Sequence, residues 1–171
     1  MFTLIVGPMK SGKTKYIIDN YYEKRDLIEI YKPSIDTRDT NIIKSRAYDD
    51  KVMNCQQICH LSEIKPQKSI IIIDEFQFFN AEELKDFVLK CKQQPMELIM
   101  SGLDLLADRT EWTSYTAIKS LCDKLIKLRA ICTICGEPAE FSTLISGDKN
   151  KKIQIEGEAT YEPRCNKHCC D

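Results

Sequence analysis

The stretch GPMKSGKT at residues 7–14 constrains the fold of this chain more than any other feature. It matches the pattern G-x-x-x-x-G-K-[ST], in which glycines let backbone N–H groups wrap nucleotide phosphates. The apolar run FTLIV precedes it, and apolar or aromatic residues at helical spacing follow it. Because such a loop joins a buried strand to the N-terminus of a helix, this context favours a phosphate site over a chance match.

The pattern gives two residues of the loop separate tasks. Lys13 would neutralise phosphate charge, and the Thr14 hydroxyl would bind Mg²⁺. The predicted ATP-binding residues of the loop are Gly7, Pro8, Met9, Lys10, Ser11, Gly12, Lys13 and Thr14.

Strand-like and helix-like segments alternate over residues 1–128. Short apolar runs predict strands at residues 2–6, 27–31, 70–73 and 97–100. Helical spacing predicts helices after Thr14, from an N-cap at Asn80 that forms a capping box with Glu83, and from Tyr115 to Leu125. The polar residues 36–66 predict loops with short elements. This alternation is typical of an α/β P-loop (RecA-like) domain with a mainly parallel sheet flanked by helices.

Residues 70–79, IIIIDEFQFF, supply a second half of the site. The β-branched run predicts a strand buried on both faces, and Asp74 ends it. A carboxylate at that place can hold Mg²⁺ directly or through water. Glu75 beside it can take a proton from an attacking oxygen, and the residues leave open whether that oxygen belongs to water or to a substrate hydroxyl.

Charge and apolar composition exclude two classes of partner. The 25 basic and 26 acidic residues give a net charge of −1, which lacks the basic footprint of a nucleic-acid binder. The longest apolar run, residues 70–73, is far shorter than a membrane span, and no leader sequence opens the chain. We therefore expect a cytoplasmic protein with neither nucleic-acid nor membrane partners.

Cysteines gather in the last part of the chain, where five of the nine follow residue 130. Two pairs repeat the same spacing, a C-x-x-C followed by a C-x-x-H, which predicts a tetrahedral structural Zn²⁺ site. Cys169 and Cys170 remain rivals for the fourth position, and unliganded cysteines in a reducing compartment remain an alternative. The predicted small zinc-binding domain covers residues 129–171, and its ligands are Cys132, Cys135, Cys165 and His168.

These motifs together resemble the type II thymidine kinase family over nearly the whole chain. The resemblance is carried in order by GPMKSGKT, KPSIDTR, DEFQFF, GLD, DKLIKLRAICTIC and the terminal Tyr161 with Cys165. It implies transfer of the ATP γ-phosphate to the 5′-hydroxyl of thymidine or deoxyuridine, with Glu75 as general base. It also implies homotetramers and feedback inhibition by thymidine triphosphate.

The resemblance further implies two groups of binding residues. Around Mg·ATP it places Asp36, Thr37, Arg38, Asp74 and Gln77. The loop after Cys135 is similar to the family's lasso, a segment that closes over the nucleoside. The lasso residues that would hold base and sugar are Lys152, Ile153, Gln154, Ile155, Glu156 and Tyr161.

Three positions depart from the family's pattern around the base. Ala107 stands where an aromatic residue usually stacks on the base, Ser142 replaces the usual threonine, and Leu144 replaces an arginine. A kinase for another deoxynucleoside therefore stays open. Two hypotheses from other functional classes also stay open. One is a P-loop ATPase module with a zinc knuckle, and the other is a catalytically silent homologue that only binds nucleotide.

Overall fold

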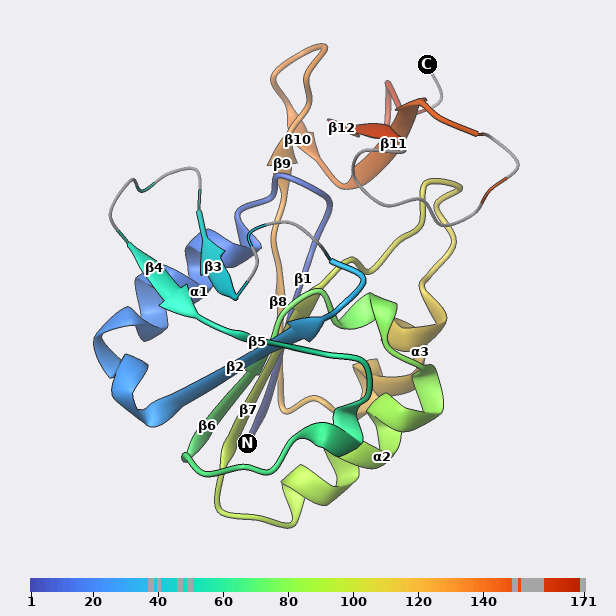
Figure 1. Cartoon of the computed structure of the whole chain (residues 1–171). Helices are drawn as coiled ribbons and strands as arrows, with labels where there is room; N and C mark the ends of the chain where they lie inside the picture. Colours follow the sequence, from blue (N-terminus) through green and yellow to red (C-terminus); the bar gives the residue numbers. More distant parts are fainter. Residues whose placement is uncertain are drawn as a thin grey trace.

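The structure is a computed structural model that describes residues 1–36, 39, 41–45, 48, 51–148, 151 and 159–169. Its centre is a six-stranded sheet in the order β5-β2-β6-β7-β1-β8, and every neighbouring pair is parallel (Figure 1). The strands are β1 (Phe2–Val6), β2 (Ile28–Pro33), β5 (Gln56–Ile58), β6 (Ile70–Ile73), β7 (Glu97–Gly102) and β8 (Lys124–Lys127). The predicted α/β fold with a mainly parallel sheet is confirmed.

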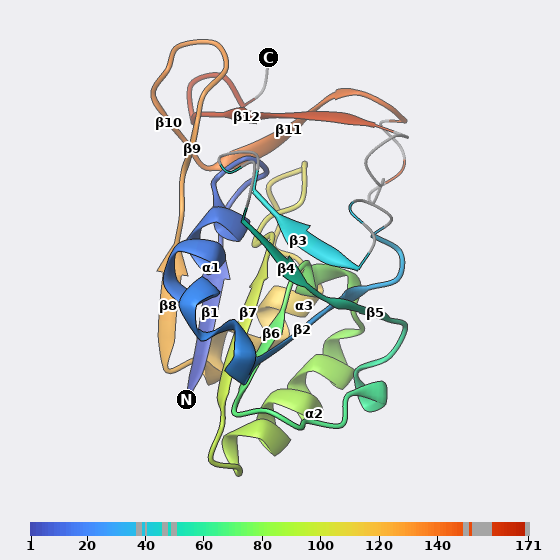
Figure 2. The same ribbon diagram turned by 60° about the vertical axis from the view of Figure 1, so that its left-hand side comes forward.

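Helices cover both faces of this sheet (Figures 1 and 2). Helix α1 (Lys13–Tyr21), which continues into the 3₁₀ turn η1 (Tyr22–Leu27), packs on one face together with the hairpin of β3 (Ile42–Lys44) and β4 (Val52–Asn54). Helices α2 (Ala81–Lys92) and α3 (Thr113–Ile118) pack on the other face. The predicted first helix is therefore an α-helix that ends in a 3₁₀ turn.

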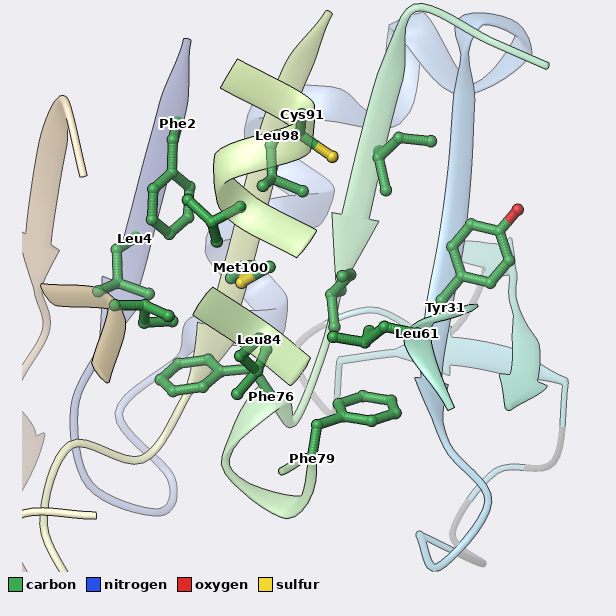
Figure 3. Packing of buried hydrophobic residues seen from close by; sticks show 14 of the residues in the cluster. Phe2, Leu4, Tyr31, Leu61, Phe76, Phe79, Leu84, Cys91, Leu98 and Met100 are labelled. Atoms are coloured by element: carbon green, nitrogen blue, oxygen red, sulfur yellow. The ribbon is translucent and has the colours of Figure 1, made fainter. Parts of the chain in front are cut away.

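Strand β6 shows why its sequence is apolar at every position. Ile71 and Ile73 join the cluster under α2 and α3, whereas Ile70 and Ile72 join the cluster under α1. Figure 3 shows the first cluster, where Leu84 and Cys91 of α2 pack on the strands. Each fully buried apolar side chain of this kind contributes roughly 1.5–3 kcal/mol of transfer free energy.

The N-terminus of α2 departs from the predicted capping box. Asn80 caps it as predicted, since its Oδ1 accepts from the N–H groups of Glu82 (2.9 Å) and Glu83 (3.2 Å). The Glu83 carboxylate instead accepts from the N–H of Leu61 at 2.5 Å and of Ser62 at 3.4 Å. It therefore caps the 3₁₀ turn η2 (Leu61–Glu63), whose first N–H groups lack partners within the turn.

The predicted helix from Tyr115 to Leu125 is wrong in its last part. The helical segment ends with the 3₁₀ turn η4 (Lys119–Leu121), and Leu125 lies in β8, paired with Leu4 of β1. Asp123 lies just before the strand, and its carboxylate accepts from the Phe2 N–H of β1 at 2.7 Å. Pairing with the free edge of β1 outweighs the local helical spacing, which a short apolar run does not specify strongly.

The segment after β8 forms two small antiparallel sheets above the carboxyl ends of the strands (Figure 1). One pairs β9 (Ala130–Ile131) with β10 (Pro138–Ala139), and the other pairs β11 (Phe141–Ser146) with β12 (Thr160–Arg164). The boundary after residue 128 stays a prediction. Among the described residues, no helix is both long enough and apolar enough to cross a bilayer.

Candidate active site

The phosphate loop follows β1 at the carboxyl edge of the sheet, where α/β proteins bind their ligands. Its first residue, Gly7, has a φ of 151°. A Cβ on Gly7 would lie 2.4 Å from the carbonyl oxygen of Leu128, the residue that follows β8. Only glycine allows this close approach of two backbones.

Polar groups line the inside of the loop. The buried Lys13 donates from Nζ to the carbonyl oxygens of Gly7 (3.0 Å) and Pro8 (2.9 Å). The Ser11 hydroxyl oxygen is also buried and has no hydrogen-bond partner within the described part of the chain. Buried polar groups are costly when unpaired, so phosphate oxygens that accept from Ser11 and Lys13 fit this loop. The turn is completed by Met9, Lys10, Gly12 and the half-buried Thr14.

Asp74 lies directly after β6, and its carboxylate is buried. Its Oδ1 accepts from the Ser101 hydroxyl of β7 and from the Glu75 N–H at 3.1 Å. Burial and the neighbouring charge of Glu75 raise the pKa of Asp74 to about 6. A bound cation would offset the cost of ionising this buried carboxyl, so Asp74 is well suited to bind Mg²⁺. Sequence reasoning missed Ser101, because its hydroxyl reaches Asp74 only across the sheet.

Replacing Asp74 with asparagine is expected to stabilise the fold above pH 6. The raised pKa means that the wild type loses stability as pH rises from about 4 to about 6, where the buried carboxyl ionises. The asparagine oxygen can still accept both hydrogen bonds without a charge. The difference in the free energy of unfolding between the two proteins should therefore grow over this pH range to at most about 3 kcal/mol and stay constant at higher pH.

Urea denaturation of both proteins without Mg²⁺ between pH 4 and pH 8 measures that difference. A difference that does not change with pH would show that the buried charge of Asp74 does not limit stability.

Glu75 is the N-cap residue of the 3₁₀ turn η3 (Phe76–Phe78), and its backbone lies in the left-handed region, with a φ of 54°. A non-glycine residue in this region costs of order 1–3 kcal/mol, and such residues gather at functional sites. The Glu75 carboxylate is half-buried, and its Oε2 accepts from the Gln77 Nε2 at 2.6 Å. The two neighbouring carboxylates thus differ in environment, since Asp74 is buried and Glu75 is partly exposed to solvent.

Lys32 is a site residue that sequence reasoning missed. It lies at the carboxyl end of β2, is 2% exposed, and its Nζ lies 3.7 Å from Oδ2 of Asp36. The same Nζ donates to the carbonyl oxygen of Asp39 at 2.9 Å. A buried lysine needs a counter-charge, so this pair fixes Asp36 beside the strand end. The signal was a lysine directly after the strand predicted at residues 27–31. Thr37 and Arg38 lie outside the described residues.

The four side chains of the predicted zinc site lie together. Their ligand atoms all lie within 4.8 Å of one another. The Sγ atoms of Cys135 and Cys165 are 3.6 Å apart, and Nδ1 of His168 lies 3.3 Å from Sγ of Cys165 and 3.9 Å from Sγ of Cys132. Three sulfurs and one imidazole at this spacing fit a closed tetrahedral Zn²⁺ site.

The environment of Cys132 favours the thiolate that binds metal. Burial alone raises the pKa of this thiol, but backbone N–H groups of Cys135, Cys165 and Ile134 point at its sulfur. Together they lower the pKa of Cys132 to about 6. The knuckle is therefore prepared for a cation before one binds.

Cys169, the described rival for the fourth zinc position, has other partners. Its Sγ donates to the carbonyl oxygen of Asn166 at 3.3 Å and accepts from the Arg109 guanidinium at 3.6 Å. Cys170 lies outside the described residues. Changing both cysteines to alanine should therefore leave one Zn²⁺ per chain, measured by elemental analysis of the purified protein. Loss of metal in this variant would move the fourth ligand away from His168.

The hairpin of β11 and β12 contacts the phosphate loop. Ser142 of β11 is buried, and its Oγ accepts from the N–H of Met9 at 2.9 Å. Tyr161 of β12 is half-buried and pairs in register with Leu144. The predicted lasso residues 152–156 lie outside the described residues. The hairpin thus contacts the predicted phosphate loop at one end and leads directly into Cys165 of the predicted zinc site at the other.

Ala107 lies half-buried at the tip of a turn that a bridge between Leu105 and Glu111 closes. This turn contacts the segment that follows β12, since its Arg109 donates to Cys169. The carbonyl oxygen of Cys169 in turn accepts from the Thr143 hydroxyl of β11 at 3.4 Å. Trp112, the large ring nearest in sequence, is only 7% exposed and packs against Phe78 with ring centroids 5.8 Å apart. Trp112 therefore belongs to the core and cannot replace the missing ring at Ala107 without unpacking.

A family model described as thymidine kinase matches residues 1–169. The chain belongs to the thymidine kinase family. A thymidine kinase from Mycoplasma genitalium is 33% identical over 173 residues, which cover 96% of this chain and 81% of the relative. A thymidine kinase from Amsacta moorei entomopoxvirus is 32% identical, with 95% and 93% covered, and one from Pseudothermotoga lettingae is 29% identical, with 95% and 91% covered.

The site residues that the family resemblance implies come from distant parts of the sequence. The structure brings many of them to the carboxyl edge of the six-stranded sheet. Lys13, Asp36 and Asp74 follow β1, β2 and β6, and the last two strands are neighbours. Ser142 reaches the same edge through Met9. Chain segments far apart in sequence thus surround the carboxyl ends of the parallel strands.

Proposed function

We propose that this chain transfers the γ-phosphate of ATP to the 5′-hydroxyl of thymidine, with Glu75 as the general base. The observation that carries this proposal is the position of Asp74 and Glu75 directly after β6, at the edge of the sheet that also holds the phosphate loop. The thymidine kinase family model matches residues 1–169 of the same chain. A half-buried carboxylate at that edge suits proton removal from a hydroxyl.

Binding of ATP would use the groups that line the phosphate loop. Lys13 and the loop N–H groups would hold the phosphates, and the Ser11 hydroxyl would gain the acceptor that it lacks among described residues. Asp74 and Thr14 would hold Mg²⁺, which neutralises charge on the phosphates when bound. Lys32 keeps Asp36 at this edge through their ion pair.

The nucleoside would lie between this edge and the hairpin of β11 and β12. Its 5′-hydroxyl would point at Glu75, which would take the proton as the oxygen attacks the γ-phosphorus. The bond from that phosphorus to the β,γ-bridging oxygen would break, and ADP would leave. Ser142, Tyr161, Ala107 and residues 152–156 are proposed around base and sugar. The zinc cluster would hold the hairpin in place, because the described chain offers that small domain little apolar core beyond Ala130, Cys132, Ala139 and Cys165.

Homotetramers and feedback inhibition by thymidine triphosphate are part of the proposal and rest on the sequence resemblance. Size-exclusion chromatography with light scattering tests the first, with four chains expected. Competition against ATP and thymidine tests the second, and an unchanged rate with thymidine triphosphate present would argue against it.

A kinase for a different deoxynucleoside is the second candidate. The observation that favours it is the small side chain of Ala107, which leaves space where family members usually place a ring. Purified protein with γ-labelled Mg·ATP and each nucleoside in turn tests both candidates. Label should appear in thymidine monophosphate, with deoxyuridine also accepted. Preference for a purine or for deoxycytidine would support the second candidate instead.

Ala107→Phe is expected to tighten thymidine binding. The added ring would supply a stacking face, and base–aromatic stacking is worth roughly 1–3 kcal/mol per base in single-strand binders. The gain should appear mainly as a lower KM for thymidine at nearly constant kcat in steady-state kinetics. Loss of activity would show that another side chain or a larger base fills this space.

A further inference from the structure

The side chain of Gln77 is a buried polar group beside the proposed base, Glu75. The family resemblance places it around Mg·ATP, yet it is only 3% exposed. It lies in the turn η3, two residues after Glu75. Its amide group contacts the backbone of Leu103 and the carboxylate of Glu75.

The orientation of the Gln77 amide is fixed by a backbone group. The N–H of Leu103 donates to Oε1 of Gln77 at 3.0 Å. Because an N–H can only donate, the oxygen end of the amide must face Leu103. The nitrogen end therefore faces Glu75, and Nε2 donates to Oε2 of that carboxylate at 2.6 Å.

The strand β7 and helix α3 hold Gln77 in this orientation. A Cβ on Gly102 would lie 2.3 Å from Oε1 of Gln77 and 2.7 Å from the Phe76 ring, so only glycine leaves room for the amide. The Ser114 hydroxyl of α3 contacts the carbonyl oxygens of Gln77 (3.1 Å) and Phe79 (2.8 Å). Backbone and side chain of Gln77 are thus both fixed by neighbouring elements.

We propose that Gln77 is a positioning residue, whose amide, oriented by the Leu103 N–H and seated over Gly102, holds the Glu75 carboxylate in its reactive orientation. This inference rests on the proposed function of Glu75 as the base. It differs from a direct contact between Gln77 and ATP, because it predicts that Gln77 matters only while Glu75 carries its carboxylate.

A double-mutant cycle tests this dependence. Gln77→Met keeps the side-chain length but removes both hydrogen bonds, and it should lower kcat roughly 10- to 100-fold, the scale of a misplaced catalytic group. The KM for ATP should change less than about twofold. In the Glu75→Gln background the same substitution should change kcat less than about twofold, since no carboxylate remains to be positioned.

Gln77→Glu provides a second variant that keeps an acceptor for the Leu103 N–H and replaces the amide donor to Glu75 with a second carboxyl, which competes with Glu75 for a proton. It should show the same kcat loss with an unchanged KM for ATP. Gln94→Met, a matched change at an exposed position after α2, should leave both constants at wild-type values. Thermal unfolding of every variant verifies that each is folded at the assay temperature.

Two outcomes would overturn the inference while wild-type protein still phosphorylates thymidine. One is that Gln77→Met lowers kcat by the same factor in the wild-type and in the Glu75→Gln background, which would mean that the two residues act independently. The other is a raised KM for ATP with normal kcat, which would place Gln77 on the nucleotide. Failure of the wild type to phosphorylate any nucleoside would instead count against the proposed function itself.

Discussion

Glu75→Gln is expected to lower the rate of phosphoryl transfer by roughly 10²–10⁴-fold, the range that general-base catalysis supplies. The substitution keeps the volume of the side chain but removes its ability to accept a proton. In the proposed site Lys13 and the loop amides, and not Glu75, hold the phosphates, so the affinity for ATP should change little. Single-turnover kinetics with labelled ATP, together with equilibrium binding of ATP, measure the two effects separately.

The matched control is Glu82→Gln, a change of the same kind at an exposed position in the first turn of α2. This control should retain the wild-type rate. Near-normal turnover in Glu75→Gln would show that a different group removes the proton.

Removal of Zn²⁺ is expected to abolish thymidine binding and to leave ATP binding intact. Binding of structural Zn²⁺ supplies about 10–16 kcal/mol in small zinc domains, far more than the few apolar contacts of Ala130 and Ala139. The two core clusters on the sheet contain none of the described zinc-site residues, so the phosphate loop should stay folded. Calorimetric titrations with thymidine and with an ATP analogue, before and after chelation, test this.

Cys132→Ser should reproduce the effect of chelation, because it removes one predicted ligand. Cys59→Ser, at an exposed cysteine away from the cluster, is the control and should bind both ligands normally. Absence of zinc from freshly purified active protein, or full thymidine binding after its removal, would contradict the proposed role of the metal.

The buried strands and the phosphate loop could be predicted because their patterns are local. Residues 70–73 are β-branched at every position, and they form β6 with those limits. The two edge strands of the sheet were harder, since β5 spans three residues and Leu125 of β8 is 48% exposed. Edge strands take their conformation from the neighbour that they pair with, which a sequence pattern does not show.

The candidate site was predictable in its residue types and less so in their contacts. The spacing of Cys132 and Cys135 indicated a metal knuckle, because ligand spacing is itself a local property. The partners of Asp74 and Asp36 could not be read in this way. Ser101 reaches Asp74 only because the neighbouring parallel strands β6 and β7 bring their carboxyl ends together. Lys32 reaches Asp36 only because the chain turns directly after β2.

The destination of the γ-phosphate of ATP distinguishes a nucleoside kinase from an ATPase in a single reaction. Wild-type protein, Mg·ATP and thymidine would be monitored by ³¹P NMR, with a second sample lacking thymidine. We expect a thymidine monophosphate signal that grows together with the ADP signal in the first sample, and almost no inorganic phosphate in the second. Inorganic phosphate released at the same rate in both samples would contradict the proposed kinase reaction, because Glu75 would then activate water.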